Sequence, residues 1–115
     1  METLTLRDFH IILEVLKLIG HYKENNKIIS FTKEIDEEKN IIYNLMLSKN
    51  NIKIKYIFLI TENTICCIIQ DKYKYTLKLD NQKIDIYFGN YLLNTIPIKI
   101  ESFKNNYLRK KRVFK

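Results

Sequence analysis

The chain has 115 residues, of which 46% are hydrophobic and 29% are charged. This composition excludes a disordered chain, and the length suits one globular domain with no room for a second. Ile, Lys and Asn occupy 20, 17 and 12 positions and alanine is absent, which is typical of an AT-rich coding sequence.

The net charge of +7 is concentrated near the C-terminal end. Six cations and no acid occur between Lys104 and Lys115, whereas the other residues carry 14 cations and 13 acids. A separate basic segment indicates an acidic partner, such as nucleic acid, an acidic protein surface or anionic lipid, or else a solvated end. We therefore predict a single domain over residues 1–103 and a basic tail over residues 104–115.

Apolar residues at helical spacing predict a long amphipathic helix from Leu6 to Tyr22. Thr5 and Asp8 have the spacing of a capping box, and Gly20 offers a stop signal. Charged positions within the helix exclude a membrane span, and the first residues lack the pattern of a signal peptide. We therefore expect a cytoplasmic protein, in the host cytoplasm if it is viral, with no membrane contact.

Alternating apolar residues predict a run of short strands over residues 27–35, 52–61, 64–70, 73–79, 83–88 and 95–103. Residues 36–51 fit a short helix or a strand, and the regular spacing of the hairpins favours the strand. The predicted fold class is α+β: an N-terminal amphipathic helix packed on a curved, mostly antiparallel sheet of about five to seven short strands, followed by the basic C-terminal tail.

Both faces of the central strands are apolar. If the turns at 62–63 and 71–72 have two residues each, one face gathers Ile54, Tyr56, Phe58, Ile60, Ile65, Cys67 and Ile69, bordered by Lys74 and Lys78. The other face gathers Ile57, Leu59, Cys66, Ile68, Tyr75 and Leu77, bordered by Lys55. A sheet with one solvent-exposed face would carry polar side chains on that face. We therefore expect the helix to cover one face, and a closed barrel-like sheet or a homodimer to cover the other.

The sequence contains no catalytic or metal-binding motif. His10 and Glu14 lie one helical turn apart without a third ligand, which favours a solvated helix face. Cys66 and Cys67 are neighbours in a strand and point to opposite faces, so they predict reduced, unreactive core thiols rather than a disulfide.

Carboxylates in the predicted turns and strands leave a small metal-dependent nuclease as a second alternative, because nuclease sites draw such groups from adjacent strands. The residues concerned are Glu34, Asp36, Glu37, Glu38, Asp80, Asp85 and Glu101.

We predict a non-enzymatic binding protein without a cofactor or metal. A small domain of this composition is typical of phage or mobile-element accessory proteins that bind and inhibit a host protein or a protein–nucleic acid complex, as an anti-defence inhibitor does. Direct nucleic-acid binding is the first alternative, because cations neutralise phosphates and aromatic rings stack on bases. The candidate binding residues are Lys53, Lys55, Lys72, Lys74, Lys78, Tyr107, Arg109, Lys110, Lys111, Arg112 and Phe114.

Overall fold

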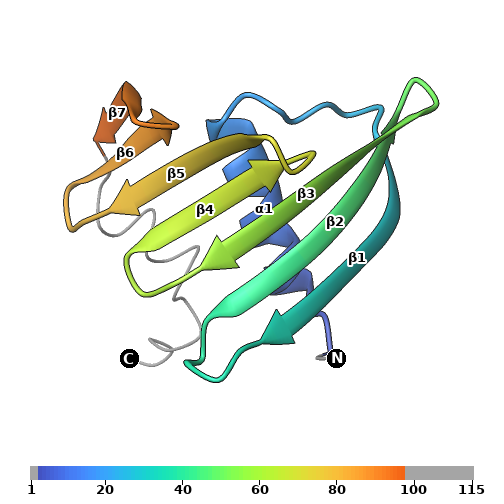
Figure 1. Cartoon of the computed structure of the whole chain (residues 1–115), viewed down its shortest axis with the longest axis horizontal. Coiled ribbons are helices and arrows are strands. Elements are labelled where there is room, and N and C mark those ends of the chain that lie inside the picture. The colour runs from blue at the N-terminus through green and yellow to red at the C-terminus, as the bar shows by residue number, and fades with distance from the viewer. Residues whose placement is uncertain (1–2, 98–115) are drawn as a thin grey trace.

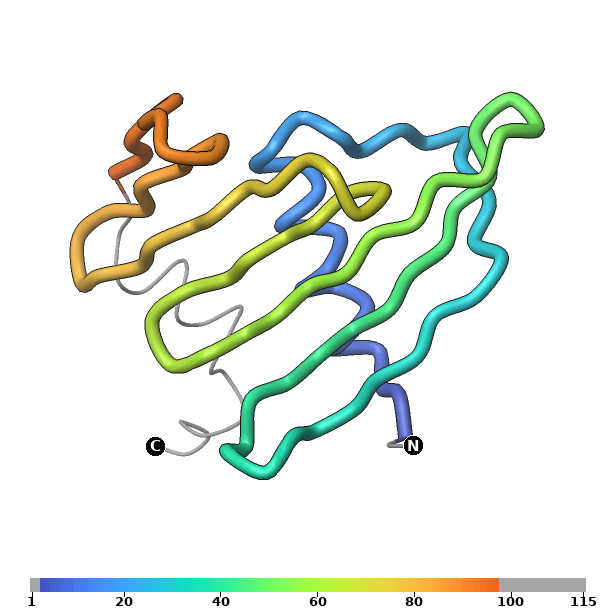
Figure 2. Tube along the Cα trace, viewed as in Figure 1, coloured from blue at the N-terminus to red at the C-terminus, as the bar shows by residue number. Residues whose placement is uncertain are grey.

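This computed structural model describes residues 3–97, which form an antiparallel sheet with a helix against one face. The elements in chain order are α1 (Leu6–Leu18), β1 (Lys27–Ile35), β2 (Ile41–Lys49), β3 (Ile52–Ile60), β4 (Thr64–Ile69), β5 (Tyr73–Leu79), β6 (Lys83–Phe88) and β7 (Tyr91–Pro97). The seven strands lie side by side in their order along the chain (Figure 1), so the path is a simple meander (Figure 2). β1 and β7 do not pair with each other, so the sheet is open.

These features correct the predicted fold class. The chain is mainly antiparallel sheet with one short helix over the described residues, rather than an α+β domain with a long helix. The closed barrel-like sheet is also wrong: α1 covers one face and provides the burial that closure would otherwise supply. The packing of a helix on an antiparallel sheet agrees with the prediction. The basic tail, residues 104–115, lies outside the described residues.

The helix begins and ends with specific capping interactions. The side chain of Thr5 accepts a hydrogen bond from the backbone N–H of Asp8, and Asp8 in turn accepts one from the backbone N–H of Thr5, which completes the predicted capping box. Gly20 has φ +80°, and the N–H groups of Gly20 and His21 donate to the carbonyls of Lys17 and Leu16. This Schellman motif ends α1 one turn before the predicted end. No helix in residues 3–97 is long and apolar enough to cross a membrane.

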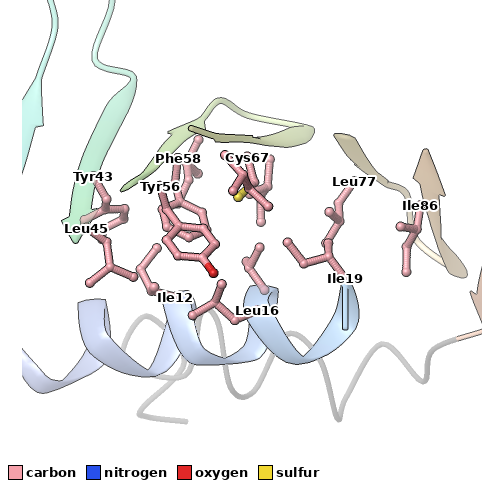
Figure 3. Close-up of a cluster of buried hydrophobic side chains, with 14 of the residues drawn as sticks. Ile12, Leu16, Ile19, Tyr43, Leu45, Tyr56, Phe58, Cys67, Leu77 and Ile86 are labelled. Atoms are coloured by element: carbon pink, nitrogen blue, oxygen red, sulfur yellow. The ribbon is translucent and has the colours of Figure 1, made fainter. Parts of the chain in front are cut away.

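The core lies between α1 and the sheet face that we call the inner face. Ile12, Leu16 and Ile19 of α1 point towards this face, and aromatic and aliphatic side chains of the strands meet them (Figure 3). The buried inner-face residues are Tyr43, Leu45, Leu47, Tyr56, Phe58, Ile60, Ile65, Cys67, Ile69, Leu77, Ile84 and Ile86.

The turn between β4 and β5 corrects the predicted assignment of residues to the two faces. Ile69 pairs with Tyr73, so this loop has three residues rather than two, and two of them, Gln70 and Asp71, adopt positive φ. A shift of one residue moves every side chain of a strand to the opposite face. Leu77, together with Tyr75, therefore lies on the inner face, and Lys74 and Lys78 lie on the other.

Candidate functional site: the outer face of the sheet

The face opposite α1, which we call the outer face, carries a central group of aliphatic side chains. Across the strands Ile42 pairs with Leu59, and Ile57 pairs with Ile68. These four residues form what we call the aliphatic stripe. All four are half-buried, and no helix or strand of residues 3–97 lies over them (Figure 1). Cys66, opposite Leu59, extends the stripe towards β5.

Four of the five predicted sheet lysines lie on the same face as this stripe, and two of them, Lys55 and Lys74, are adjacent to it. Lys53 and Lys55 lie on β3 opposite Ser48 and Met46, beyond one end of the stripe. Lys74 lies directly opposite Ile68, and Lys78 lies opposite Thr64. The corrected register of β5 therefore brings Lys74 and Lys78 to the same face as Lys55, which the sequence analysis had placed on the opposite side.

The lysines differ in how strongly they are held. Lys55 Nζ lies 3.3 Å from the carboxylate of Asp71, and Lys78 Nζ lies 4.8 Å from the ring centre of Tyr87. Such exposed contacts contribute at most about 1 kcal/mol each. The side chains of Lys53 and Lys74 make no ion pair with any residue of the described chain, and both are exposed.

Lys72 is apart from this group. It lies in the turn between β4 and β5, with its Nζ 5.2 Å from the ring centre of Tyr73. The predicted tail residues, Tyr107, Arg109, Lys110, Lys111, Arg112 and Phe114, lie outside the described residues, so a continuous patch that joins them to the sheet lysines stays a prediction.

Two of the seven carboxylates considered for a nuclease site hold turns, and Glu101 lies outside the described residues. Asp36 accepts hydrogen bonds from the backbone N–H groups of Glu38 and Asn40. Asp80 likewise accepts from the N–H groups of Gln82 and Lys83, which lowers the pKa of its carboxyl group. No group of three His, Cys, Asp or Glu residues within residues 3–97 could hold a metal ion. These contacts give the two carboxylates a local structural role.

The helix histidine and its neighbour are also solvated. His10 and Glu14 are exposed, and Glu14 lies 3.9 Å from Lys17 in a loose surface ion pair. This arrangement agrees with a solvated helix face.

The two cysteines occupy different faces of β4. Cys67 is fully buried on the inner face, where burial and, to a smaller extent, the neighbouring Cys66 raise the pKa of its thiol to about 12. The thiol stays protonated at neutral pH, which suits a core residue and not a nucleophile. Cys66 is half-buried on the outer face, with its Sγ 3.6 Å from the hydroxyl of Thr76.

The sequence analysis did not predict a buried polar network at the start of α1. Asp8 is 5% exposed, and its carboxylate accepts hydrogen bonds from Tyr43 and from Lys33 Nζ at 3.2 Å, besides those from Thr5. Burial alone would raise the pKa of Asp8, but the hydrogen bonds from Tyr43, Thr5 and Lys33 together lower it. The spacing of Thr5 and Asp8 predicts the cap, whereas nothing local marks the contacts from β1 and β2.

Comparisons with protein-family models, curated proteins and solved structures found no match to this chain.

Proposed function

We propose that the protein is a non-enzymatic binding protein that docks its outer face on a host protein, either free or within a protein–nucleic acid complex, in the cytoplasm. The observation that supports this most directly is the aliphatic stripe on the face that α1 leaves uncovered. Apolar surface removed from water stabilises a complex by roughly 25 cal/mol per Å². The half-buried side chains of the stripe stabilise the fold less than the buried side chains of the core do. Their apolar character therefore favours a role in binding.

The flanking lysines indicate the charge of the partner. Lys53, Lys55, Lys74 and Lys78 share the outer face, where the acids are Glu34 and Asp85. The surface therefore suits a partner with an apolar centre and an acidic border. Complementary charge of this kind mainly accelerates association and excludes wrong partners. A second copy of the chain suits this surface less well, because two outer faces would bring lysines together.

Direct nucleic-acid binding has less support on this face. Sheets that bind single strands present aromatic rings for base stacking, with cations around them. Here the centre is aliphatic, and Tyr87, at its edge, already contacts Lys78. The basic tail keeps nucleic acid as an alternative, which the experiment below separates from a protein partner.

The proposal is tested by affinity capture from a bacterial lysate on the full chain, with and without nuclease. The variant Ile57→Asp places a charge in the centre of the stripe. Ile52→Asp is the matched control: the same substitution in the same strand, at a position that is already 64% exposed and lies outside the stripe. Circular dichroism checks that both variants are folded.

We expect a protein that survives nuclease treatment, is lost with Ile57→Asp and is retained with Ile52→Asp. Its affinity for the purified chain should then fall at least tenfold with Ile57→Asp, because a buried unpaired charge costs several kcal/mol. Capture that disappears with nuclease would favour the nucleic-acid alternative. Equal capture by both variants would show that the outer face is not the binding site.

A further inference from the structure

The two ends of the sheet carry opposite charge. Because the strands form a meander, the turns that follow β2, β4 and β6 lie at one end of the sheet, together with the segment that leads from α1 to β1 (Figure 1). Counted with two flanking residues of each strand, these segments contain six lysines and two acids: residues 19–28, 48–53, 68–74 and 87–92. The segments at the opposite end, counted in the same way, contain three lysines and six acids: residues 34–42, 59–65 and 78–84. The first end, which we call the basic end, is therefore the one that attracts a polyanion.

A row of aromatic side chains on the inner face reaches the basic end. Tyr75 of β5 pairs with Phe88 of β6, and Phe88 pairs with Tyr91 of β7. Directly paired residues, and residues two apart in one strand, share a face of the sheet, so these three side chains and Tyr73 lie on the inner face together. The ring centres of Tyr73 and Tyr75 lie 6.1 Å and 5.0 Å from that of Phe88. We call these four residues the aromatic row.

The aromatic row is open to solvent at both of its ends, because α1 stops at Leu18. His21, in the segment after the helix, packs edge-on against Tyr75, with the ring centres 5.5 Å apart. Tyr73 and Tyr91, by contrast, are 45% and 77% exposed. Exposed rings stabilise the fold less than buried ones, since little of their apolar surface is removed from water. Their place among the lysines of the basic end therefore favours a role in binding.

We propose that the basic end binds a single strand of nucleic acid, with unpaired bases stacked on Tyr73 and Tyr91 and the phosphates beside the lysines. Bases of any sequence stack on aromatic rings, while lysines neutralise the backbone. Neighbouring strands lie about 4.8 Å apart, so β5 and β7 hold these rings roughly 10 Å apart, which suits on the order of two or three nucleotides. A duplex or an acidic peptide would match the lysines but would offer no free base to the rings.

This site does not require the proposed partner of the outer face. The aromatic row and the aliphatic stripe lie on opposite faces of the sheet. Lys53 and Lys74 are at the basic end and also on the outer face, so neither is used to test the site. Lys72, whose Nζ lies 5.2 Å from the ring centre of Tyr73, is the lysine in contact with the aromatic row.

Fluorescence anisotropy tests the rings, with the full chain titrated into labelled oligothymidylate and oligouridylate of about 12 nucleotides. The tighter of the two identifies the strand as DNA or RNA. Tyr73→Ala and Tyr91→Ala should each weaken it at least about fivefold, the lower limit for one stacked base, whereas Tyr73→Phe and Tyr91→Phe should retain the affinity. The matched control is Tyr87→Ala, the same substitution on the outer face of β6, which should also retain it. Circular dichroism checks the fold, which Tyr91→Ala should leave intact because Tyr91 is so exposed.

Two lysine variants separate local charge from net charge. Lys72→Gln at the basic end and Lys39→Gln in the turn between β1 and β2 each remove one charge from an exposed turn residue. Lys72→Gln should flatten the slope of log affinity against log salt by about 0.7, the value for one phosphate contact of a single strand. Lys39→Gln should leave the slope unchanged.

Three results would overturn the inference. Neither oligonucleotide binds at low salt, or Tyr91→Ala binds as tightly as the wild type, or Tyr87→Ala weakens binding as much as Tyr91→Ala does. Polyglutamate, measured in competition, tests an acidic peptide as the ligand. If Tyr91→Ala weakened polyglutamate as much as the oligonucleotide, the basic end would recognise acidic peptides rather than unpaired bases, and the inference would again be overturned.

Discussion

Neighbouring residues of β4 show how the two faces of the sheet differ. Cys67 and Ile69 point towards α1 and are 0% and 4% exposed, whereas Cys66 and Ile68 point away from it and are half-buried. The same strand thus contributes to a closed core on one side and, on the other, to an apolar surface that no helix or strand of residues 3–97 covers. An apolar residue in this sheet is therefore not by itself evidence of a core position, and the two faces should respond differently to substitution.

The largest difference is expected between Ile69→Ala and Ile68→Ala. Truncation of a buried isoleucine costs the transfer free energy of the lost atoms and leaves a cavity, so Ile69→Ala should lower the free energy of unfolding by about 2–4 kcal/mol. Ile68→Ala should cost about 1 kcal/mol, because its side chain is already partly hydrated. Urea denaturation of both variants measures the two values. Equal losses would mean that the outer face is covered as well as the inner face.

Asp8 tests the polar edge of the inner face. Asp8→Asn leaves Lys33, whose side chain is 16% exposed, without its carboxylate, and should cost about 2–3 kcal/mol at pH 7. The folded state lowers the pKa of Asp8, so its contribution is complete above the unfolded pKa of about 3.9 and is lost as the pH falls through the lower, folded pKa. The difference between wild type and variant should therefore shrink below about pH 4.

The matched control for Asp8 is Asp71→Asn, which removes an exposed ion pair with Lys55. It should change stability by less than about 0.5 kcal/mol at any pH. A wild-type advantage over Asp8→Asn that was as large at pH 3 as at pH 7 would show that the charge of Asp8 is not what stabilises the network.

The cysteines provide a smaller comparison within one strand. Cys67→Ser should cost about 1–3 kcal/mol through a buried hydroxyl, whereas Cys66→Ser should cost less than about 1 kcal/mol because Cys66 is half-buried beside Thr76. In the native protein, iodoacetamide at pH 8 should modify Cys66 first, since the pKa of Cys67 is raised to about 12. Mass spectrometry of the alkylated peptides identifies the order. Equal rates at both thiols would contradict the burial of Cys67.

Local patterns in the sequence predict much of this fold. The bounds of β1, β5 and β6 agree with the alternation of apolar residues, and the strand rather than the helix forms at β2. The last predicted strand, 95–103, is wrong in its start: β7 begins at Tyr91. An irregularity in its pairing with β6 places Leu92 opposite Tyr87 but Asn94 opposite Ile86, so the consecutive leucines break the alternation that a strand normally shows.

The candidate site depends on information that alternation does not contain. Whether Lys74 and Lys78 lie on the same face as the aliphatic stripe is decided by the number of residues in the turn before β5, and a difference of one residue reverses the answer. The contacts of Asp8 with Lys33 and Tyr43 span 25 and 35 residues, and no spacing rule connects such distant positions. The sequence therefore predicts the apolar outer face but not which lysines border it.

The smallest effect on stability is expected for Lys74→Glu. Lys74 is exposed, makes no ion pair within the described residues and lies opposite Ile68 at the border of the stripe. Reversal of its charge should therefore change the free energy of unfolding by less than about 0.5 kcal/mol. If the outer face binds an acidic partner, the same change should slow association, and the effect should weaken as salt is added, because exposed charges act over a Debye length of about 10 Å at 0.1 M salt. Stopped-flow or surface-based kinetics with the captured partner measure both rates.

Lys72→Glu, in the turn and apart from the stripe, is the control and should slow association less. If the two variants are equally slow, the net charge of the chain attracts the partner, and the outer face has no special role in the encounter.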